Sequence, residues 1–140
     1  MSPFFQILLG LVLNLVTLSI HLMIVTLSLQ TVKQNISFVR EQGGVLAKMA
    51  FILFSVLILS LAVLLEAAIW AVTFVSTDAV GSFKDGVYFA IVTLTTLGYG
   101  DIAPSEDAQL LAALCAIAGL FVMGLSTAFV VEILRRLEAD

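Results

Sequence analysis

Three long apolar segments constrain the fold of this 140-residue chain more than any other feature of its sequence. They run from Phe4 to Leu29, from Met49 to Val75 and from Ala108 to Val131, and Glu66 is the only formally charged residue within them. Each is longer than the roughly 20 residues that a helix needs to cross the hydrocarbon core of a bilayer. A content of 61% apolar and 11% charged residues also points to a bilayer rather than to water. The sequence therefore predicts an all-α membrane protein with three transmembrane helices.

The first apolar segment could instead be a cleaved export signal. It is too long for one, no basic residue precedes it, and no cleavage site follows it. We therefore expect an N-terminal transmembrane helix over residues 1–32, followed by a cytoplasmic linker over residues 33–48.

The basic residues predict the orientation of the chain in the membrane. Five of the six lie in the linker or after the third apolar segment, at Lys33, Arg40, Lys48, Arg135 and Arg136. Because cytoplasmic loops carry an excess of lysine and arginine, the linker and a short tail over residues 135–140 should be cytoplasmic. The N-terminus and the region between the second and third segments should then lie outside.

A shorter apolar run lies between the second and third segments, from Gly86 to Leu97. It is too short to cross a bilayer, and its length suits a re-entrant element. Ser82 and Asp85 have the spacing of a capping box, which predicts a short helix over residues 83–95. Gly98 and Gly100 should end this helix, because glycine reaches left-handed backbone angles at little steric cost. Irregular backbone at membrane depth is tolerated where it lines an aqueous path, so an extended pore-lining segment is expected here.

Residues 96–101 read Thr-Leu-Gly-Tyr-Gly-Asp and resemble the signature of the potassium channel family. The resemblance extends from about Met49 to Val131, and the chain most resembles the minimal two-helix bacterial channels. It implies a pore domain over residues 49–134, made of an outer helix (49–75), a pore helix (83–95), a selectivity filter (96–101) and an inner helix (106–134).

The same resemblance implies the partners and the location of the protein. Four chains are needed to complete each ring of ligands around an ion, so we expect a homotetramer of four-fold symmetry. Membrane lipids are the other expected partner, nucleic acid is not expected, and a bacterial inner membrane is the expected location.

The family pattern also implies which groups bind the permeant ion, which is K⁺, and it implies no cofactor. The ligands are the backbone carbonyls of Thr96, Leu97, Gly98 and Tyr99 together with the Thr96 hydroxyl, and Gly100 completes the filter. Leu97 departs from the more common valine, which puts the rigidity and inactivation of the filter in question. The short helix should direct the negative end of its dipole toward a cation below the filter.

Four residues are expected to support the filter by resemblance: Tyr88, Phe89, Val92 and Asp101. Some bacterial members place a glutamate at the position of Val92, where it bonds the aspartate that matches Asp101. The aromatic cuff of the family implies instead that Tyr88 is the partner of Asp101, with Phe89 beside it.

One face of the third apolar segment should line the cavity and the gate. The cavity residues implied by the resemblance are Leu120, Met123 and Thr127, and a lower apolar constriction would consist of Val130, Val131 and Leu134. Gly119 occupies a position where the family often has a hinge glycine. Glycine also allows close packing of membrane helices, so both interpretations of Gly119 remain open.

Glu66 is a polar group at membrane depth, and such groups usually face a partner or water. Counted from the outer face, Glu66 is level with Asn14, whereas His21 is about 12 Å deeper. Asn14 or Thr17 is therefore the predicted partner of Glu66, with support of the pore helix as the alternative role. His21 is expected to be a helix-contact or snorkelling residue rather than a metal ligand, because one histidine and one cysteine are too few for a site.

The region from Ser76 to Asp107 carries five acidic residues and one basic residue, a net charge of about −4 per chain. In a tetramer these acids could enrich cations at an outer mouth. They are equally well explained as ordinary helix-start and loop residues, and the two interpretations are compatible.

Other function classes remain to be distinguished from a selective channel. No nucleophile and base pair, phosphate loop or cofactor fingerprint is present, so an enzyme is not expected. A non-conducting accessory subunit would keep the pore fold without carrying ions alone, and a non-selective cation channel would pass sodium as well as potassium.

Overall fold

The structure, a computed structural model, describes residues 1–138. Within this range the chain consists of helices joined by short turns and one longer loop: α1 (Pro3–Gln42), α2 (Val45–Ser76), α3 (Phe83–Leu94), the 3₁₀ turn η1 (Glu106–Ala108) and α4 (Gln109–Glu138). Three stretches are long and apolar enough to cross a membrane, namely Pro3–Val39, Val45–Ser76 and Glu106–Glu138. The prediction of an all-helical protein with three such helices is confirmed.

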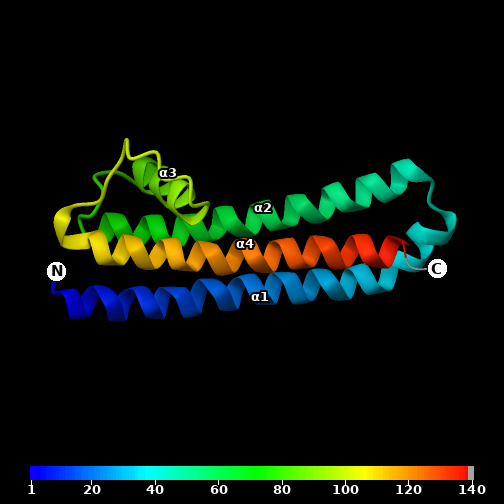
Figure 1. Ribbon diagram of the computed structural model, residues 1–140, viewed down its shortest axis with the longest axis horizontal. Helices are drawn as coiled ribbons and strands as arrows, with labels where there is room; N and C mark the ends of the chain where they lie inside the picture. The colour runs from blue at the N-terminus through cyan, green and yellow to red at the C-terminus, as the bar shows by residue number, and fades with distance from the viewer. Residues whose placement is uncertain (139–140) are drawn as a thin grey trace.

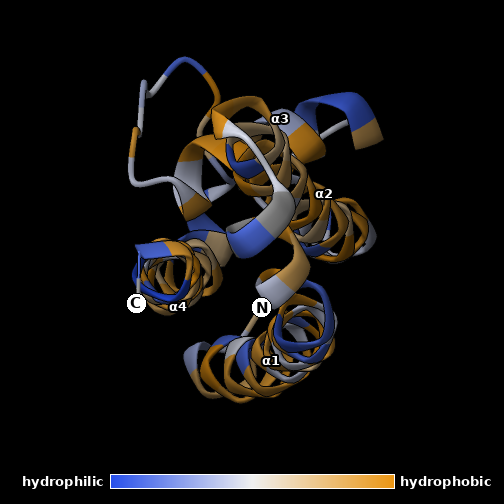
Figure 2. Cartoon of the chain, turned by 90° about the vertical axis from the view of Figure 1, so that its right-hand side faces the viewer, coloured by the Kyte–Doolittle hydropathy of each residue, from blue (hydrophilic) through white to orange (hydrophobic). Residues whose placement is uncertain are grey.

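The three long helices lie side by side, and α1 and α4 run in the same direction while α2 runs in the opposite one (Figure 1). The short helix α3 lies against one end of α2 and α4. Viewed along the bundle, α1 packs on the side of α2 and α4 that faces away from α3 (Figure 2). The helix that precedes the expected pore domain therefore contacts both long helices of that domain.

Residues 33–48, which we expect to form a cytoplasmic linker, are helical except at the turn between α1 and α2, and their cytoplasmic location stays a prediction. Helix α1 continues to Gln42 and α2 begins at Val45, so the helices are separated only by residues 43 and 44. Residues 33–42 contain no glycine or proline, and Ile36 and Val39 pack against an apolar cluster that contains Val32 and Ile133. The bend occurs at Gly43, where a β-carbon would lie 2.3 Å from the Val39 carbonyl oxygen, so any side chain would clash there.

The other helix bounds also differ from the predicted ones at their ends. The outer helix begins at Val45 rather than at residue 49, and the short helix ends at Leu94 rather than at residue 95. Helix α4 extends to Glu138, so the predicted tail is helical over residues 135–138, and residues 139–140 lie outside the described range. The division into a pore domain and an additional helix stays a prediction.

Two apolar cores hold the bundle together, one at each end. The outer core joins α2, α3 and α4 through Ala67, Trp70, Phe74, Ala79, Val80, Phe89, Ala90, Leu94, Ala108, Leu111, Cys115 and Ala118. The inner core joins α1, α2 and α4 through Val25, Val32, Leu59, Phe129, Ile133 and Leu137. Fully buried polar side chains, including those of His21 and Glu66, lie between the two cores.

Candidate functional site

Helix α3 begins at the predicted residue, Phe83, and ends at Leu94, one residue before the predicted end. The Ser82 hydroxyl accepts a hydrogen bond from the Asp85 backbone N–H at 3.1 Å and donates to the Asp85 carboxylate at 2.7 Å. This cap fixes the first turn of α3. A close approach at Gly86, where a β-carbon would lie 3.2 Å from the Ala71 carbonyl oxygen, fixes the distance between α3 and α2.

The segment after α3 is attached to the last carbonyls of the helix by its backbone N–H groups. The Val92 carbonyl accepts hydrogen bonds from the N–H groups of Leu97, at 3.0 Å, and Gly98, at 3.1 Å. The Thr96 N–H donates to Thr93 at 3.0 Å. Because these peptide bonds are trans, each carbonyl points opposite to the N–H of the following residue. The carbonyls of Thr96 and Leu97 therefore both point away from α3.

The backbone of this segment alternates in hand from one residue to the next. The φ angles are positive at Thr96 (59°), Gly98 (55°) and Gly100 (78°), and not at Leu97 or Tyr99 between them. A β-branched threonine in the left-handed region of backbone angles is strained, at a cost of about 1 to 3 kcal/mol. Strain of this kind persists where the surrounding structure determines it and clusters at functional sites. Residues 96–100 are therefore the first candidate for a functional site in the described chain.

The hydrogen bond that the sequence predicted between Tyr88 and Asp101 is present. The Tyr88 hydroxyl donates to the Asp101 carboxylate at 2.7 Å, and joins α3 to the residue that follows the glycines. This hydrogen bond is the main cause that raises the pKa of Tyr88 above its ordinary value, because the carboxylate stabilises the protonated phenol. Hydrogen bonds therefore hold the segment at both ends. The Val92 carbonyl holds its start, and the Tyr88 hydroxyl holds Asp101, which follows its end.

Phe89 and Val92 lie behind the segment, on the buried face of α3. The Phe89 ring packs edge-on against Phe74 of α2 with 5.0 Å between the ring centroids. Val92 is buried and contributes its backbone carbonyl to the segment, as described above. A role of these residues in supporting a filter stays a prediction.

The side chains of Leu97 and Tyr99 are exposed in the single chain, by 54% and 67%. They belong to a run of exposed residues from Thr95 to Asp101. Exposed large apolar side chains of this kind mark a surface that contacts another protein chain or a membrane. The strained segment, residues 96–100, therefore lies wholly on the surface of the single chain.

The predicted cavity and gate residues other than Gly119 lie on an open face of α4 or line a groove beside it, and Thr127 and Val131 do both. Leu120, Thr127, Val131 and Leu134 are exposed, as expected of a face without a partner in the single chain. An apolar groove of about 600 Å³ lies between α2, α4 and the end of α3. Its lining includes Met123, Thr127, Val130 and Val131 from α4, together with Thr95, the residue that precedes the strained segment. The structure thus brings the end of α3 and the predicted cavity residues to one place.

Gly119, the candidate hinge, packs against α3 and does not lie on the open face. It is buried, and a β-carbon there would lie 2.0 Å from the Leu94 carbonyl oxygen. Nothing lies within 4 Å of the corresponding position at Gly124. Of the two interpretations that the sequence left open, this geometry supports close packing at Gly119.

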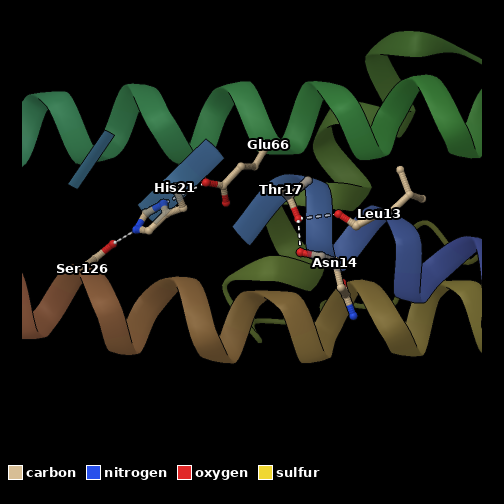
Figure 3. Close-up of polar contacts among 6 residues, drawn as sticks. All are labelled: Leu13, Asn14, Thr17, His21, Glu66 and Ser126. Carbon is tan, nitrogen blue, oxygen red and sulfur yellow. Dashed lines mark hydrogen bonds and ion pairs between the residues drawn. The ribbon is translucent and has the colours of Figure 1, made fainter. Parts of the chain in front are cut away.

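The predicted partner of Glu66 is wrong, because the structure pairs Glu66 with His21 (Figure 3). The Nδ1 atom of His21 lies 2.8 Å from Oε1 of Glu66, and the Nε2 atom of His21 lies 3.1 Å from the Ser126 hydroxyl. Both His21 and Glu66 are fully buried. The Thr17 hydroxyl instead donates to the Leu13 carbonyl, and the Asn14 side chain points away from Glu66 (Figure 3).

The depth count failed because it placed the start of α1 level with the end of α2. The position of α1 is set by α4 instead: the Gln6 side-chain oxygen accepts hydrogen bonds from the N–H groups of Leu110, at 3.1 Å, and Leu111, at 3.3 Å. Gly10 meets the side chain of Leu114 one turn further on. The pairing of His21 with Glu66 implies that α1 begins about 12 Å beyond the end of α2.

Sequence reasoning missed two residues in these contacts, Gln6 and Ser126. Gln6 satisfies backbone donors at the start of α4 that have no partner within the helix. Both are polar side chains within apolar segments, which was the available signal. Their partners lie more than 100 residues away along the chain, so no local pattern identifies them.

The chain matches the family model described as "Ion channel" over residues 51–136, which is more than half of its length. It is 34% identical over 70 residues to a hyperpolarization-activated voltage-gated potassium channel of Methanocaldococcus jannaschii, covering 50% of this chain and 33% of that protein. It is 51% identical over 41 residues to two pore potassium channel b of Oryza sativa subsp. japonica, covering 29% of this chain and 12% of that protein.

A third relative is potassium voltage-gated channel subfamily A member 10 of Mus musculus, at 40% identity over 52 residues, which covers 36% of this chain and 10% of that protein. The chain thus spans between a tenth and a third of the length of these relatives. No solved structure matches the chain significantly. The family match includes α3, the strained segment, most of α2 and nearly all of α4. The chain therefore belongs to the ion channel family, and the relatives named here are potassium channels.

Proposed function

We propose that the chain forms a homotetrameric channel that conducts K⁺ passively and selectively through a pore on its four-fold axis. Residues 96–100 are the proposed filter, with the carbonyls of Thr96, Leu97, Gly98 and Tyr99 as ligands in place of the hydration shell of K⁺. Helix α3 is the proposed re-entrant pore helix. The name of each curated relative, which includes the word potassium, supports this choice of ion.

The observation that carries the proposal is the orientation of the backbone after α3. The carbonyls of Thr96 and Leu97 point to the same side, away from the helix, because the N–H groups that follow them bond the Val92 carbonyl. A row of carbonyl oxygens with one orientation is the arrangement that selects a dehydrated cation. Symmetry copies of the segment would complete the rings of oxygen atoms.

The distribution of charge supports the direction of the pore across the membrane. Helix α3, which contains Asp85, and the loops on either side of it, which contain Asp78 and Asp101, lie at one end of the bundle. The C-terminal parts of α1 and α4, which contain Lys33 and Arg135, lie toward the opposite end (Figure 1). By the positive-inside rule, the N-terminus would be outside and the C-terminus in the cytoplasm. The acidic end would then face the outside and raise the local concentration of cations. A bacterial inner membrane is the proposed location.

Recording from the purified protein in a planar bilayer under a K⁺ gradient tests this function. The reversal potential should follow the K⁺ gradient, and replacement of K⁺ by Na⁺ on one side should shift it strongly. Bilayers that receive the same detergent without protein are the control. A reversal potential that did not shift when Na⁺ replaced K⁺ would favour a non-selective channel.

The non-conducting accessory subunit gives a different result in the same assay. Purified protein of that kind would insert and assemble but would carry no current alone. Absence of any current from correctly folded, four-chain protein would therefore contradict the proposed function.

A further inference from the structure

The imidazole of His21 joins the two long helices that border the proposed pore, although it belongs to neither of them. It lies between Glu66 of α2 and Ser126 of α4, with 2.8 Å on one side and 3.1 Å on the other (Figure 3). No hydrogen bond joins Glu66 and Ser126 directly in the described part of the chain. The polar connection between α2 and α4 at this depth therefore passes through a side chain of α1.

Burial at membrane depth makes this connection difficult to replace. His21 and Glu66 are both 0% exposed, so neither side chain has water as an alternative partner. A buried polar group without a hydrogen bond costs about 1 to 3 kcal/mol by mutational data. The pair carries no net charge either as imidazolium with carboxylate or as imidazole with carboxylic acid, and both forms retain the hydrogen bond between them.

The contacts of His21 with Glu66 and Ser126 are called the bridge below. Ser126 connects the bridge to the residues that line the apolar groove. Ser126 itself borders the groove, next to Thr127 and close to Met123 on the same helix. Its hydroxyl lies against the His21 ring of α1. A displacement of this part of α4 would therefore move proposed pore-lining side chains and lengthen the bond to His21 together.

Contacts on both sides of the bridge hold His21 at the required level. Toward the outer end, Gln6 caps the start of α4 through Leu110 and Leu111. Toward the inner end, Val25 and Val32 of α1 belong to the inner apolar core. The axial position of His21 is thus determined above and below, which allows one imidazole to meet partners on two helices.

We propose that His21 is a positioning residue of the pore: it couples α2 to α4 and holds the groove-lining part of α4 in place. Helix α1 is then a working part of the pore rather than a separate membrane anchor. This inference rests on the proposed function for its effect on conduction. The bridge itself can be tested without any ion current.

The test of the bridge is a double-mutant cycle between two residues that do not touch each other. Glu66→Met and Ser126→Ala remove the two polar partners of His21 with small changes of side-chain volume. The free energy of unfolding of the full chain in detergent is measured for each variant and for the double variant. Because His21 joins them, their effects should be coupled by about threefold in the folding equilibrium constant. That factor corresponds to about 0.6 kcal/mol, the mean for interhelical hydrogen bonds in a membrane protein. Strictly additive effects would overturn the proposal.

The same cycle in a His21→Phe background distinguishes coupling through the hydrogen bonds of His21 from coupling through side-chain packing. Phenylalanine keeps a ring of similar size without the two nitrogen atoms, so the coupling should disappear. Coupling that persists in this background would show that Glu66 and Ser126 interact without His21, and it would overturn the proposal. Ser126→Thr retains the hydroxyl, so its effect should add to that of Glu66→Met without coupling.

Ion flux into vesicles then tests the consequence for the pore. Ser126→Ala and His21→Phe should each change the K⁺ flux of reconstituted protein by about threefold or more, with the preference for K⁺ over Na⁺ unchanged, because the filter is not involved. Ser19→Ala is the matched control on α1: Ser19 is exposed, its hydroxyl bonds the Leu15 carbonyl, and its loss should leave the flux unaltered. Unchanged flux in both bridge variants would overturn the positioning role.

Failure of this inference and failure of the proposed function give different results. If the wild-type protein carries no flux, the proposed function fails, while the coupling between Glu66 and Ser126 still reports on the bridge. If wild-type flux is selective for K⁺ but the cycle is additive, the bridge alone fails.

Discussion

Positive backbone angles at Thr96, Gly98 and Gly100 determine what residues 96–100 can do. Two of these positions are glycines, for which such angles carry little steric cost. Thr96 lacks that freedom, so its conformation must be held by neighbouring contacts, such as the bond from its own N–H to the Thr93 carbonyl. The chemistry proposed for the site thus depends on backbone geometry more than on side chains.

Gly98→Ala should abolish the preference for K⁺ over Na⁺ without preventing membrane insertion. The φ angle of 55° at Gly98 is unfavourable for alanine by roughly 1–2 kcal/mol, so the backbone should relax and turn a carbonyl away. Within the single chain no atom lies within 4 Å of the added β-carbon, so backbone strain rather than a clash within the chain would cause the effect. The permeability ratio of reconstituted protein is the measurement.

Gly81→Ala is the matched control for that substitution. Its β-carbon also meets nothing within 4 Å, and the φ angle of Gly81 is not positive. It should retain selectivity. Wild-type selectivity in Gly98→Ala as well would contradict the assignment of residues 96–100 as a filter.

Contacts between elements place α3 and its following segment against the long helices. Helix α3 approaches α2 at Gly86 and α4 at Gly119, and both approaches are too close for a side chain to fit without movement. Two glycines on different helices therefore determine the position of the proposed pore helix. Small residues have this role between membrane helices because they allow backbones to approach.

Gly119→Ala should destabilise the folded chain by about 1 to 3 kcal/mol, the usual cost of forcing extra volume into a packed interior. The added carbon would lie 2.0 Å from the Leu94 carbonyl oxygen, so either α3 or α4 must move. Unfolding in detergent measures the loss. The open packing around Gly124 on the same helix makes Gly124→Ala the control, and no loss is expected there. Equal stability of both variants would restore the hinge as the better explanation of Gly119.

Across the whole molecule, the proposed filter lies on the surface of the single chain. Leu97 and Tyr99 are more than half exposed, and one face of α4 is open at Leu120 and Val131. Such surfaces are explained if further copies of the chain surround a common axis. A closed ring of four is the symmetric assembly that would enclose the filter.

The assembly in mild detergent should therefore have a mass of about 60 kDa for protein alone, which corresponds to four chains of 15.0 kDa. Mass measurement with subtraction of bound detergent, together with chemical crosslinking, tests this directly. Crosslinked species should end at four chains. A preparation that contained only dimers would leave each ring of ligands half complete, and the tetrameric pore would have to be abandoned.

Local features of the sequence were sufficient to predict the spanning helices, the short helix and the position of the strained segment. The length of an apolar run decides whether a helix can cross a bilayer, and a serine cap or a glycine acts within a few residues. The bond between Tyr88 and Asp101 could also be predicted, since both residues belong to one short region whose family pattern is well defined. These properties involve neighbours along the chain.

Only the tertiary structure decided how α1 relates to the other helices. The partner of Glu66 depends on the axial offset of α1, and that offset is set by Gln6 at the start of α4, more than 100 residues away. The helical continuation through residues 33–42 depends in part on the inner core that Ile36 and Val39 join. The role of Gly119 depends on a contact with α3. Each is a contact between distant segments, and hydropathy and periodicity describe a helix without determining where it sits against its neighbours.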